Sequence, residues 1–442
     1  MSTETLPPLP IPEPSLPEVH SSVGLSRSRV PWRRLLGFLG PGFLISVGYM
    51  DPGNWATDIA GGSQFGYTLL FVIMASNLIA ILLQSLSLKL GVATERDLAQ
   101  ICHEQYGKRV SLFLWLGAEI AIAACDLAEV IGSAIALNLL FHIPLFYGVL
   151  ITGLDVLLIL MLQRWGFRWI EVLVITLIGT IIAMFTIQLI LSRPEYALAL
   201  RSLIFPSAQI VSNPAMLYIA IGILGATVMP HNLYLHSSIV QSRKYQRTSE
   251  GKREAIWMAN IDSALALTVA LFVNAAILVV AAAVFHRSGH FEVAAIEDAY
   301  KLLSPLVGAA GASTLFAVAL LASGQNSSIT GTLAGQVVME GFVRIKLAPW
   351  LRRMITRSLA IIPTILVVAF TGERGTEKLL ILSQVILSMQ LSFAVVPLVI
   401  FTGSQKIMGE FVNARWLQAL SWFVAVLIAG LNAWLLVLMV KG

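Results

Sequence analysis

Two apolar segments of this chain are interrupted by proline, and each interruption carries side chains that can bind a cation. The interrupting residues are Asp51-Pro52-Gly53-Asn54 in the first segment and Met229-Pro230-His231 in the second. Because proline has no backbone N–H, the carbonyl oxygen four residues earlier loses its helical partner. The oxygens of Gly48 and Ala226 are therefore predicted to be free. At membrane depth, such irregular backbone persists only where it is buried in protein or lines a wet cavity.

The atoms near the two interruptions match the ligand preferences of a divalent transition metal. The carboxyl end of a helix carries partial negative charge, so the carbonyls of Gly48 and Ala226 suit a cation. Asp51 adds a full charge and Asn54 an amide oxygen. Met229 adds a thioether sulfur, which favours softer metals, whereas calcium and magnesium prefer hard oxygen ligands. DPGN is also a common turn sequence and methionine a common packing residue, but their conjunction in two proline-broken segments favours a metal site.

Gln384 is a further candidate ligand in a third apolar stretch. It lies within LILSQVILSMQ, where an amide is out of place unless it has a partner. The alternative is that this side chain bridges two helices by hydrogen bonds. The sequence leaves both readings open.

Three carboxylates in one apolar segment suggest a proton path. Glu119, Asp126 and Glu129 are separated by seven and three residues, which places them on one helix face. Ionisable groups inside a membrane segment are costly and mark a pathway by default. His231 lies at the second interruption, and the ordinary pKa of histidine is close to physiological pH. The alternative for the carboxylates is pairing with nearby basic residues, namely Arg243, Arg352 and Arg353. The two readings are compatible, because a chain of paired groups can pass a proton.

The composition places these segments in a membrane. The chain has 442 residues, of which 57% are hydrophobic and 12% charged, and its mean hydropathy is +0.82. So little charged surface could not cover a soluble domain of this size. The two cysteines, Cys102 and Cys125, provide no disulfide framework. No cleavable signal peptide is visible, and the proline-rich residues 1–35 are expected to form a disordered tail.

Hydropathy predicts an all-α protein with eleven membrane-spanning helices. The predicted spans are 38–63, 68–92, 111–140, 147–163, 170–192, 216–241, 258–285, 311–342, 355–371, 376–402 and 416–440. Of the 29 lysines and arginines, 22 fall on the amino-terminal side of these spans and 7 on the other. Since basic loops stay in the cytoplasm, the amino terminus is expected inside and the carboxyl terminus outside. The net charge of +5 is therefore a topology signal and not a nucleic-acid signal.

The positions of the two interruptions predict an inverted repeat. They fall in the first and sixth spans, which are five steps apart in the order of spans, and because that step is odd the two halves have opposite orientation. Residues 36–192 would form the first repeat, 193–215 an extracellular loop, 216–402 the second repeat and 416–440 an additional helix. Matched broken helices in two halves point to a transporter's binding site near the membrane midplane.

These motifs resemble the Nramp family, the natural resistance-associated macrophage proteins, and within it the bacterial proton-dependent manganese transporters. A third motif, GQNSSITGTLAGQ from Gly324 to Gln336, looks like the family's transport signature. The resemblance covers the chain after the proline-rich tail, and it implies the five-plus-five fold of sodium-coupled symporters.

The resemblance also implies that the metal-ligand side chains are Asp51, Asn54 and Met229, with carbonyl ligands Gly48 and Ala226 and a helix-10 ligand Gln384. The residues tied to proton movement would be His231, Asp126 and Glu129, and the inner basic cluster Arg243, Arg352 and Arg353. Position 48 departs from the family pattern, since relatives often have alanine there.

The expected function is secondary active import of Mn²⁺, with Fe²⁺ and Cd²⁺ as further substrates, together with protons and by alternating access. We expect no enzyme activity and no cofactor, and no GxxxxGK[ST] loop is present to suggest ATP hydrolysis. The expected location is the cell membrane. One alternative is a sodium-coupled amino-acid symporter of the same architecture, although the aspartate would repel a substrate carboxylate. A third class is a metal receptor or an ion channel.

Overall fold

The computed structural model describes residues 14–17, 19–24, 31–154, 167–293, 295–308, 311–344, 351, 354–355, 358, 361–366 and 375–441. The helices of the first half are α1 (Pro31–Phe38), α2 (Pro41–Ser46), η1 (Gly48–Met50), α3 (Pro52–Phe65), α4 (Leu70–Thr94), α5 (Leu98–Gln105), α6 (Lys108–Phe141), α7 (Leu145–Thr152), α9 (Phe167–Ser192), α10 (Tyr196–Ile204) and α11 (Gln209–Ser212). Those of the second half are α12 (Pro214–Thr227), α13 (Pro230–Ile239), η2 (Val240–Ser242), α14 (Ser249–Ala281), the π-helical turn η3 (Ala282–His286), α15 (Ile296–Val307), α16 (Ala312–Val343), α18 (Thr376–Thr402), α19 (Gln405–Met408), η5 (Gly409–Phe411) and α20 (Arg415–Lys441). Two short strands, β1 (Val23–Gly24) and β2 (Arg243–Lys244), pair in parallel.

Both predicted helix breaks are present. In the first, α2 and the short turn η1 end before Asp51, which has extended backbone (φ −69°, ψ 166°) and caps α3. In the second, α12 ends at Thr227, and Met229 is extended (φ −74°, ψ 124°) ahead of α13. Each proline is the first residue of the new helix, where its missing N–H would have had no intrahelical partner. Proline therefore restarts the helix at both breaks.

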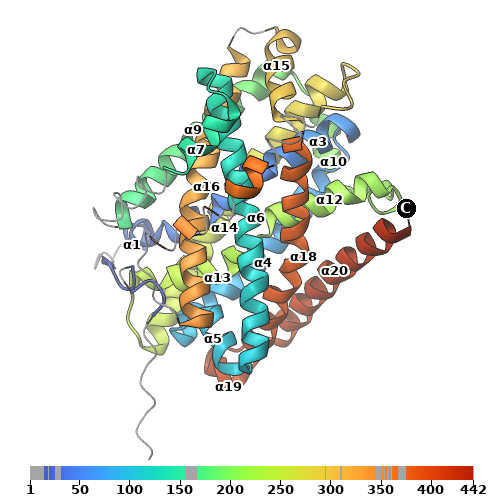
Figure 1. Cartoon of the computed structure of the whole chain (residues 1–442). Helices are drawn as coiled ribbons and strands as arrows, with labels where there is room; N and C mark the ends of the chain where they lie inside the picture. The colour runs from blue at the N-terminus through green and yellow to red at the C-terminus, as the bar shows by residue number, and fades with distance from the viewer. Residues whose placement is uncertain are drawn as a thin grey trace, which may run out of the picture.

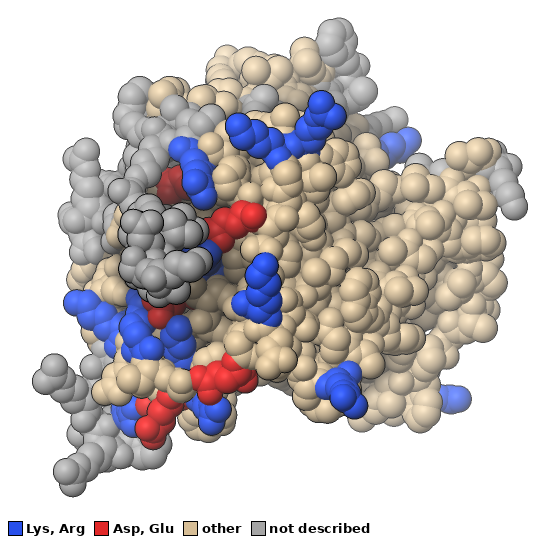
Figure 2. Space-filling model, turned by 90° about the horizontal axis from the view of Figure 1, so that it is seen from below, with Lys and Arg blue, Asp and Glu red and all other residues tan. Residues whose placement is uncertain are grey.

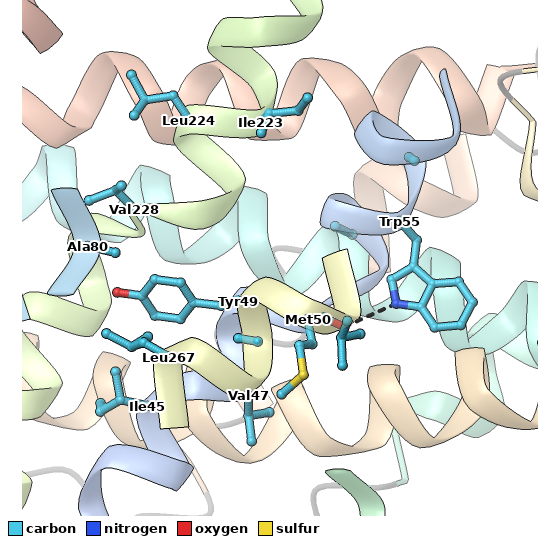
Figure 3. Packing of buried hydrophobic residues seen from close by; sticks show 14 of the residues in the cluster. Ile45, Val47, Tyr49, Met50, Trp55, Ala80, Ile223, Leu224, Val228 and Leu267 are labelled. Carbon is cyan, nitrogen blue, oxygen red and sulfur yellow. Dashed lines mark hydrogen bonds between the residues drawn. The ribbon is translucent and has the colours of Figure 1, made fainter. Parts of the chain in front are cut away.

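The broken helices lie inside a bundle of long helices (Figure 1). Helix α6 packs against α16 and α18, and α3 contacts α6, α12, α14 and α18. Figure 3 shows buried residues around the first break, where Tyr49, Met50 and Trp55 belong to the same hydrophobic cluster as Val228 beside the second break. The Trp55 indole donates to the carbonyl oxygen of Met50 at 3.2 Å, which satisfies one carbonyl at the end of η1. The core therefore encloses both breaks.

Seven helical stretches of the described residues are long and apolar enough to cross a membrane. They are Leu70–Thr94, Lys108–Phe141, Phe167–Ser192, Pro214–Ser242, Ser249–His286, Lys378–Thr402 and Arg415–Leu438. The predicted span 311–342 is one helix, α16, which carries the polar stretch GQNSSITGTLAGQ and is not among the seven. The predicted spans 147–163 and 355–371 fall partly on residues outside the described ranges. The count of eleven spans and the inverted repeat stay predictions.

Part of the amino-terminal tail packs against the bundle, which differs from the disorder expected for residues 1–35. Leu16 and Val19 are buried, and the backbone N–H of Leu16 donates to the Glu340 carboxylate of α16 at 3.1 Å. The backbone N–H of Ser21 donates to the carbonyl of Gln241, just before the β1–β2 pairing. These contacts join residues 16–24 to α16 and to the end of α13. Proline content alone did not indicate the two apolar anchors.

Charged side chains gather on the face of the molecule that Figure 2 views from below. Near the carboxyl end of α4, Glu95 pairs with Arg247 at 2.6 Å and with Lys252 at 2.9 Å. Partial burial tends to raise the pKa of Glu95, but Lys252 and Arg247 outweigh it and hold the pKa below its usual value. These ion pairs link the end of α4 to the start of α14.

Candidate metal site

At the first break, the two carboxylate oxygens of Asp51 have different surroundings. The Oδ1 atom accepts hydrogen bonds from the backbone N–H and the side-chain amide of Asn54, each at 2.7 Å. The Oδ2 atom is buried and has no hydrogen-bond partner among the described residues. A buried carboxylate oxygen without a donor is costly, so this atom is suited to receive a cation.

Three of the predicted oxygen ligands converge on one point. The side-chain nitrogen of Asn54 lies 2.7 Å from Asp51 Oδ1, 3.3 Å from the Gly48 carbonyl oxygen and 3.1 Å from the Ala226 carbonyl oxygen. Ala226 belongs to α12, so the cluster joins the two broken helices. The amide presents its nitrogen, where the sequence predicted its oxygen as a ligand. Because three acceptors meet here, an N–H donor occupies the position that a cation would take.

The Met229 sulfur lies beside the same cluster. A Cβ built on Gly48 would lie 3.1 Å from Met229 Sδ, so the sulfur is next to a predicted carbonyl ligand. On its other sides Met229 contacts buried Ala121 and Cys125 of α6 and Leu387 of α18. The structure thus places a soft donor next to the oxygens of the first break.

Gln384 contacts the amino end of α3. A Cβ on Gly53 would collide with the Gln384 amide, so glycine allows this close approach. The amide nitrogen of Gln384 donates to Ser383 Oγ at 2.9 Å, and its oxygen is buried without a partner among the described residues. The side chain therefore lies at the first break, against Gly53, which is two residues from Asp51 and next to Asn54.

The predicted proton-path residues fall into separate groups. His231 is 1% exposed, and neither ring nitrogen has a hydrogen-bond partner in the described part of the chain. Asp126 and Glu129 face α16, because a Cβ on Gly331 would lie 2.9 Å from Asp126 Oδ1 and 3.2 Å from Glu129 Oε1. Glu119 is only half-buried and accepts a hydrogen bond from Trp115 of its own helix at 3.1 Å. Asp126, Glu129 and the transport-signature helix are thus in contact.

Arg243 has a different partner from the one that the sequence suggested. Its guanidinium is fully buried and pairs with Glu171 of α9 at 2.8 Å. It also donates to the carbonyl oxygens of Phe38 (3.1 Å) and Leu39 (2.8 Å) at the end of α1. Asp262 of α14 accepts from the next backbone N–H groups, Gly40 at 3.2 Å and Gly42 at 2.6 Å. Arg352 and Arg353 lie outside the described residues.

Asn274 is a member of the site that sequence reasoning missed. Its side-chain nitrogen donates to the Tyr49 carbonyl oxygen at 2.8 Å and to Asn54 Oδ1 at 3.3 Å. Asn274 therefore donates hydrogen bonds both to a backbone carbonyl of η1 and to the side-chain oxygen of Asn54, a predicted ligand. A lone asparagine in an apolar span signals only a polar contact. Its partner is 220 residues away, so no local pattern could identify it.

Comparison with known proteins agrees with this fold. The family model for natural resistance-associated macrophage protein-like proteins matches residues 42–438. The chain is 62% identical over 423 residues to the divalent metal cation transporter MntH of Nostoc sp., covering 96% of each protein. It resembles the crystal structure of the Eremococcus coleocola manganese transporter with a TM-score of 0.88 and 43% identity, covering 95% of this chain and 90% of that one.

A more distant likeness concerns the fold alone. Mhp1, a nucleobase-cation-symport-1 family transporter, matches with a TM-score of 0.59 and 16% identity, covering 90% of this chain and 91% of that one. The match to the family model spans both helix breaks and the α16 motif. The chain belongs to the Nramp family.

Proposed function

We propose that this protein imports divalent transition metals across the cell membrane, with Mn²⁺ as the main substrate and Fe²⁺ and Cd²⁺ as others. The observation that carries the proposal is the convergence of the Asp51 carboxylate and the Gly48 and Ala226 carbonyls on one point between two broken helices. The relatives named for divalent metal and manganese transport agree with it. A membrane transporter of this kind needs no cofactor; the metal is its substrate.

The ligands divide the work of binding. Asp51 supplies the charge that attracts a dication, and the two carbonyls supply neutral oxygens at the negative ends of α12 and η1. Asn54 would add a fourth oxygen donor if its amide turned over and withdrew from the point where the three acceptors meet, which leaves that point to the cation. Met229 provides the soft ligand that disfavours calcium and magnesium. Gln384 can approach from α18, since its amide oxygen is unpartnered among the described residues.

Protons are proposed to accompany the metal through groups beside the site. His231 is two residues from the Met229 ligand, and Asp126 and Glu129 face Gly331 on the neighbouring α16. Buried ionisable groups in series are suited to pass a proton. Arg243 is proposed to close the inner end of this path, where Glu171 holds it at 2.8 Å. Glu119, half-buried and nearer the amino-terminal end of α6, is assigned a place toward the inner side.

Transport is proposed to proceed by alternating access. The two broken helices would move against the long helices, exposing the cluster first to one side and then to the other. We place residues 36–192 and 216–402 as the two inverted repeats of an eleven-span fold. The amino terminus is assigned to the cytoplasm and the carboxyl terminus to the outside, in keeping with the basic residues on the amino-terminal side.

Uptake into proteoliposomes tests the proposal. Vesicles containing a pH-sensitive dye should take up Mn²⁺ saturably and acidify inside as they do so. Asp51→Asn should abolish uptake, because it removes the full charge from the two breaks. Asp298→Asn is the matched control, since that carboxylate is 59% exposed on α15. Normal Mn²⁺ uptake by Asp51→Asn would end the site assignment, and amino-acid uptake driven by a sodium gradient would favour the symporter alternative.

A further inference from the structure

One asparagine beside the metal cluster has no role in the proposed function so far. Asn232 lies one helical turn after Met229, on the first turn of α13, and is fully buried. Its side-chain nitrogen donates to the Met229 sulfur at 3.6 Å. Its side-chain oxygen has no partner among the described residues. In the described part of the chain, the side-chain amide of Asn232 therefore has its hydrogen bond with the Met229 sulfur.

Gly48 leaves room for this amide. A Cβ built on Gly48 would collide with Asn232 Nδ2 and would lie 3.1 Å from the Met229 sulfur. The Asn232 amide thus fills the space over Gly48, between the backbone of the first break and the sulfur of the second. A side chain at position 48 would have to push the amide away from the sulfur.

The sulfur needs such a contact to hold its direction. Methionine has three rotatable side-chain bonds and adapts readily to its surroundings. The buried hydrophobic residues that cluster with Met229 are Ala121, Cys125 and Leu387, which set no strong direction for its sulfur. A thioether sulfur is a weak acceptor, and an N–H that engages one of its lone pairs leaves the other available. Fixing one lone pair therefore orients the second.

We propose that Asn232 is a positioning residue that orients the Met229 sulfur toward the metal, and that the absence of a side chain at Gly48 is what permits it. The preference of the site for soft over hard dications then depends on a donor that is not itself a ligand. The inference deepens the proposed function and rests on it, because it presupposes that Met229 binds the transported metal.

The test compares a soft metal with a harder one. Asn232→Leu keeps the approximate shape of the side chain and removes the N–H donor, and Gly48→Ala displaces the amide without deleting any polar atom. Uptake of Cd²⁺ and of Mn²⁺ is measured for each variant in proteoliposomes. We expect the KM for Cd²⁺ to rise roughly threefold to tenfold, with a smaller change for Mn²⁺, because the lost contact is one weak hydrogen bond to a soft ligand. A purely structural role would lower kcat or protein yield for both metals alike.

Matched controls and the double variant complete the experiment. Asn260→Leu removes an amide that bonds within its own helix, and Gly179→Ala adds a methyl group where no atom lies within 4 Å; both should keep the wild-type Cd²⁺ to Mn²⁺ ratio. Asn232→Leu combined with Gly48→Ala should shift the ratio no further than either single change, because both act on the same contact. Should Asn232→Leu fail to fold, Gly48→Ala decides the same question.

The outcomes separate this inference from the proposal beneath it. An unchanged ratio in Asn232→Leu and Gly48→Ala, alongside a changed ratio in Met229→Ala, would overturn the role of Asn232 and leave the metal site intact. An unchanged ratio in Met229→Ala as well would remove the sulfur from the site.

Discussion

At the scale of single residues, the site consists of acceptor oxygens that either have no hydrogen-bond partner among the described residues or share one donor. Asp51 Oδ2 is buried without a donor, and the carbonyls of Gly48 and Ala226 meet at the Asn54 amide. Such a concentration of acceptors is unfavourable without a positive group. These oxygens, with the Met229 sulfur beside them, are therefore suited to bind a dication.

In the proposed site, the Met229 thioether is the ligand expected to set which dications are accepted. Met229→Ala should keep Mn²⁺ uptake but allow Ca²⁺ or Mg²⁺ to compete, because the remaining donors are hard oxygens. Competition assays with a Ca²⁺ excess, run beside wild type, measure the effect. Continued exclusion of Ca²⁺ by the alanine variant would show that the oxygens alone provide selectivity.

The proposed role of His231, at the second break, is in proton movement and not in metal binding. His231→Ala should reduce metal-driven acidification more than it reduces metal affinity, since its ring nitrogens touch none of the cluster oxygens through a hydrogen bond in the described residues. Dye fluorescence and metal uptake are recorded in the same vesicles. Intact proton entry with normal metal uptake would count against this role.

How far the sequence predicts the site depends on whether the signal is local. Asp51, Asn54 and the Gly48 carbonyl lie within seven residues, so proline chemistry alone connects them. The pairing of Arg243 with Glu171 joins α9 to the residues after α13, and the sequence had suggested other partners. The contact of Asn274 with Asn54 spans 220 residues. These contacts depend on tertiary packing, which spacing does not encode.

At the scale of elements, small residues let the broken helices approach the long ones. A Cβ on Gly132 of α6 would collide with the ring of Pro52, the first residue of α3. Helix periodicity predicts α6 as one continuous span, but it gives no sign that its middle must lack a side chain. The sequence thus predicts where a helix breaks more readily than what the break packs against.

Gly132→Ala tests this contact. The added methyl group meets a rigid proline ring that cannot rotate away, so α3 must shift from α6. We expect a loss of about 1–3 kcal/mol of stability, as for other overpacked core positions, together with reduced metal uptake. Thermal unfolding in detergent measures the first effect, with Gly179→Ala as the control. An unchanged Tm would mean that the two helices separate without cost.

At the scale of the whole molecule, a buried ion pair connects segments that are far apart in sequence. Arg243, next to the second broken helix, binds Glu171 of α9 and the carbonyls that end α1. Arg168 also contacts Glu171 at 2.9 Å, but its side chain is half exposed. The fully buried pair is therefore the contact that fixes these segments together.

Glu171→Gln should destabilise the protein strongly. It leaves the Arg243 guanidinium buried without its counter-charge, which typically costs about 3–5 kcal/mol. Adding Arg243→Met to Glu171→Gln should recover part of the loss, because the buried guanidinium that lost its partner is then absent. Denaturation midpoints of the single and double variants give the comparison. A single variant as stable as wild type would show that the nearby carboxylate of Asp262, or solvent, compensates.

The docked amino-terminal residues have a consequence for the proposed transport cycle. Leu16 inserts beside Glu340 of α16, while β1 is paired to the strand that follows α13, so one short segment bridges a long helix and a broken one. If α13 moves away from α16, this segment must either detach from one of the two helices or move with it. Leu16→Glu, which sets a charge against Glu340, should speed proteolysis of the segment and raise hydrogen exchange in α13, whereas Ser22→Glu at an exposed position should do neither. Detachment of this segment would then be one of the steps that determine when the protein opens toward its amino-terminal side.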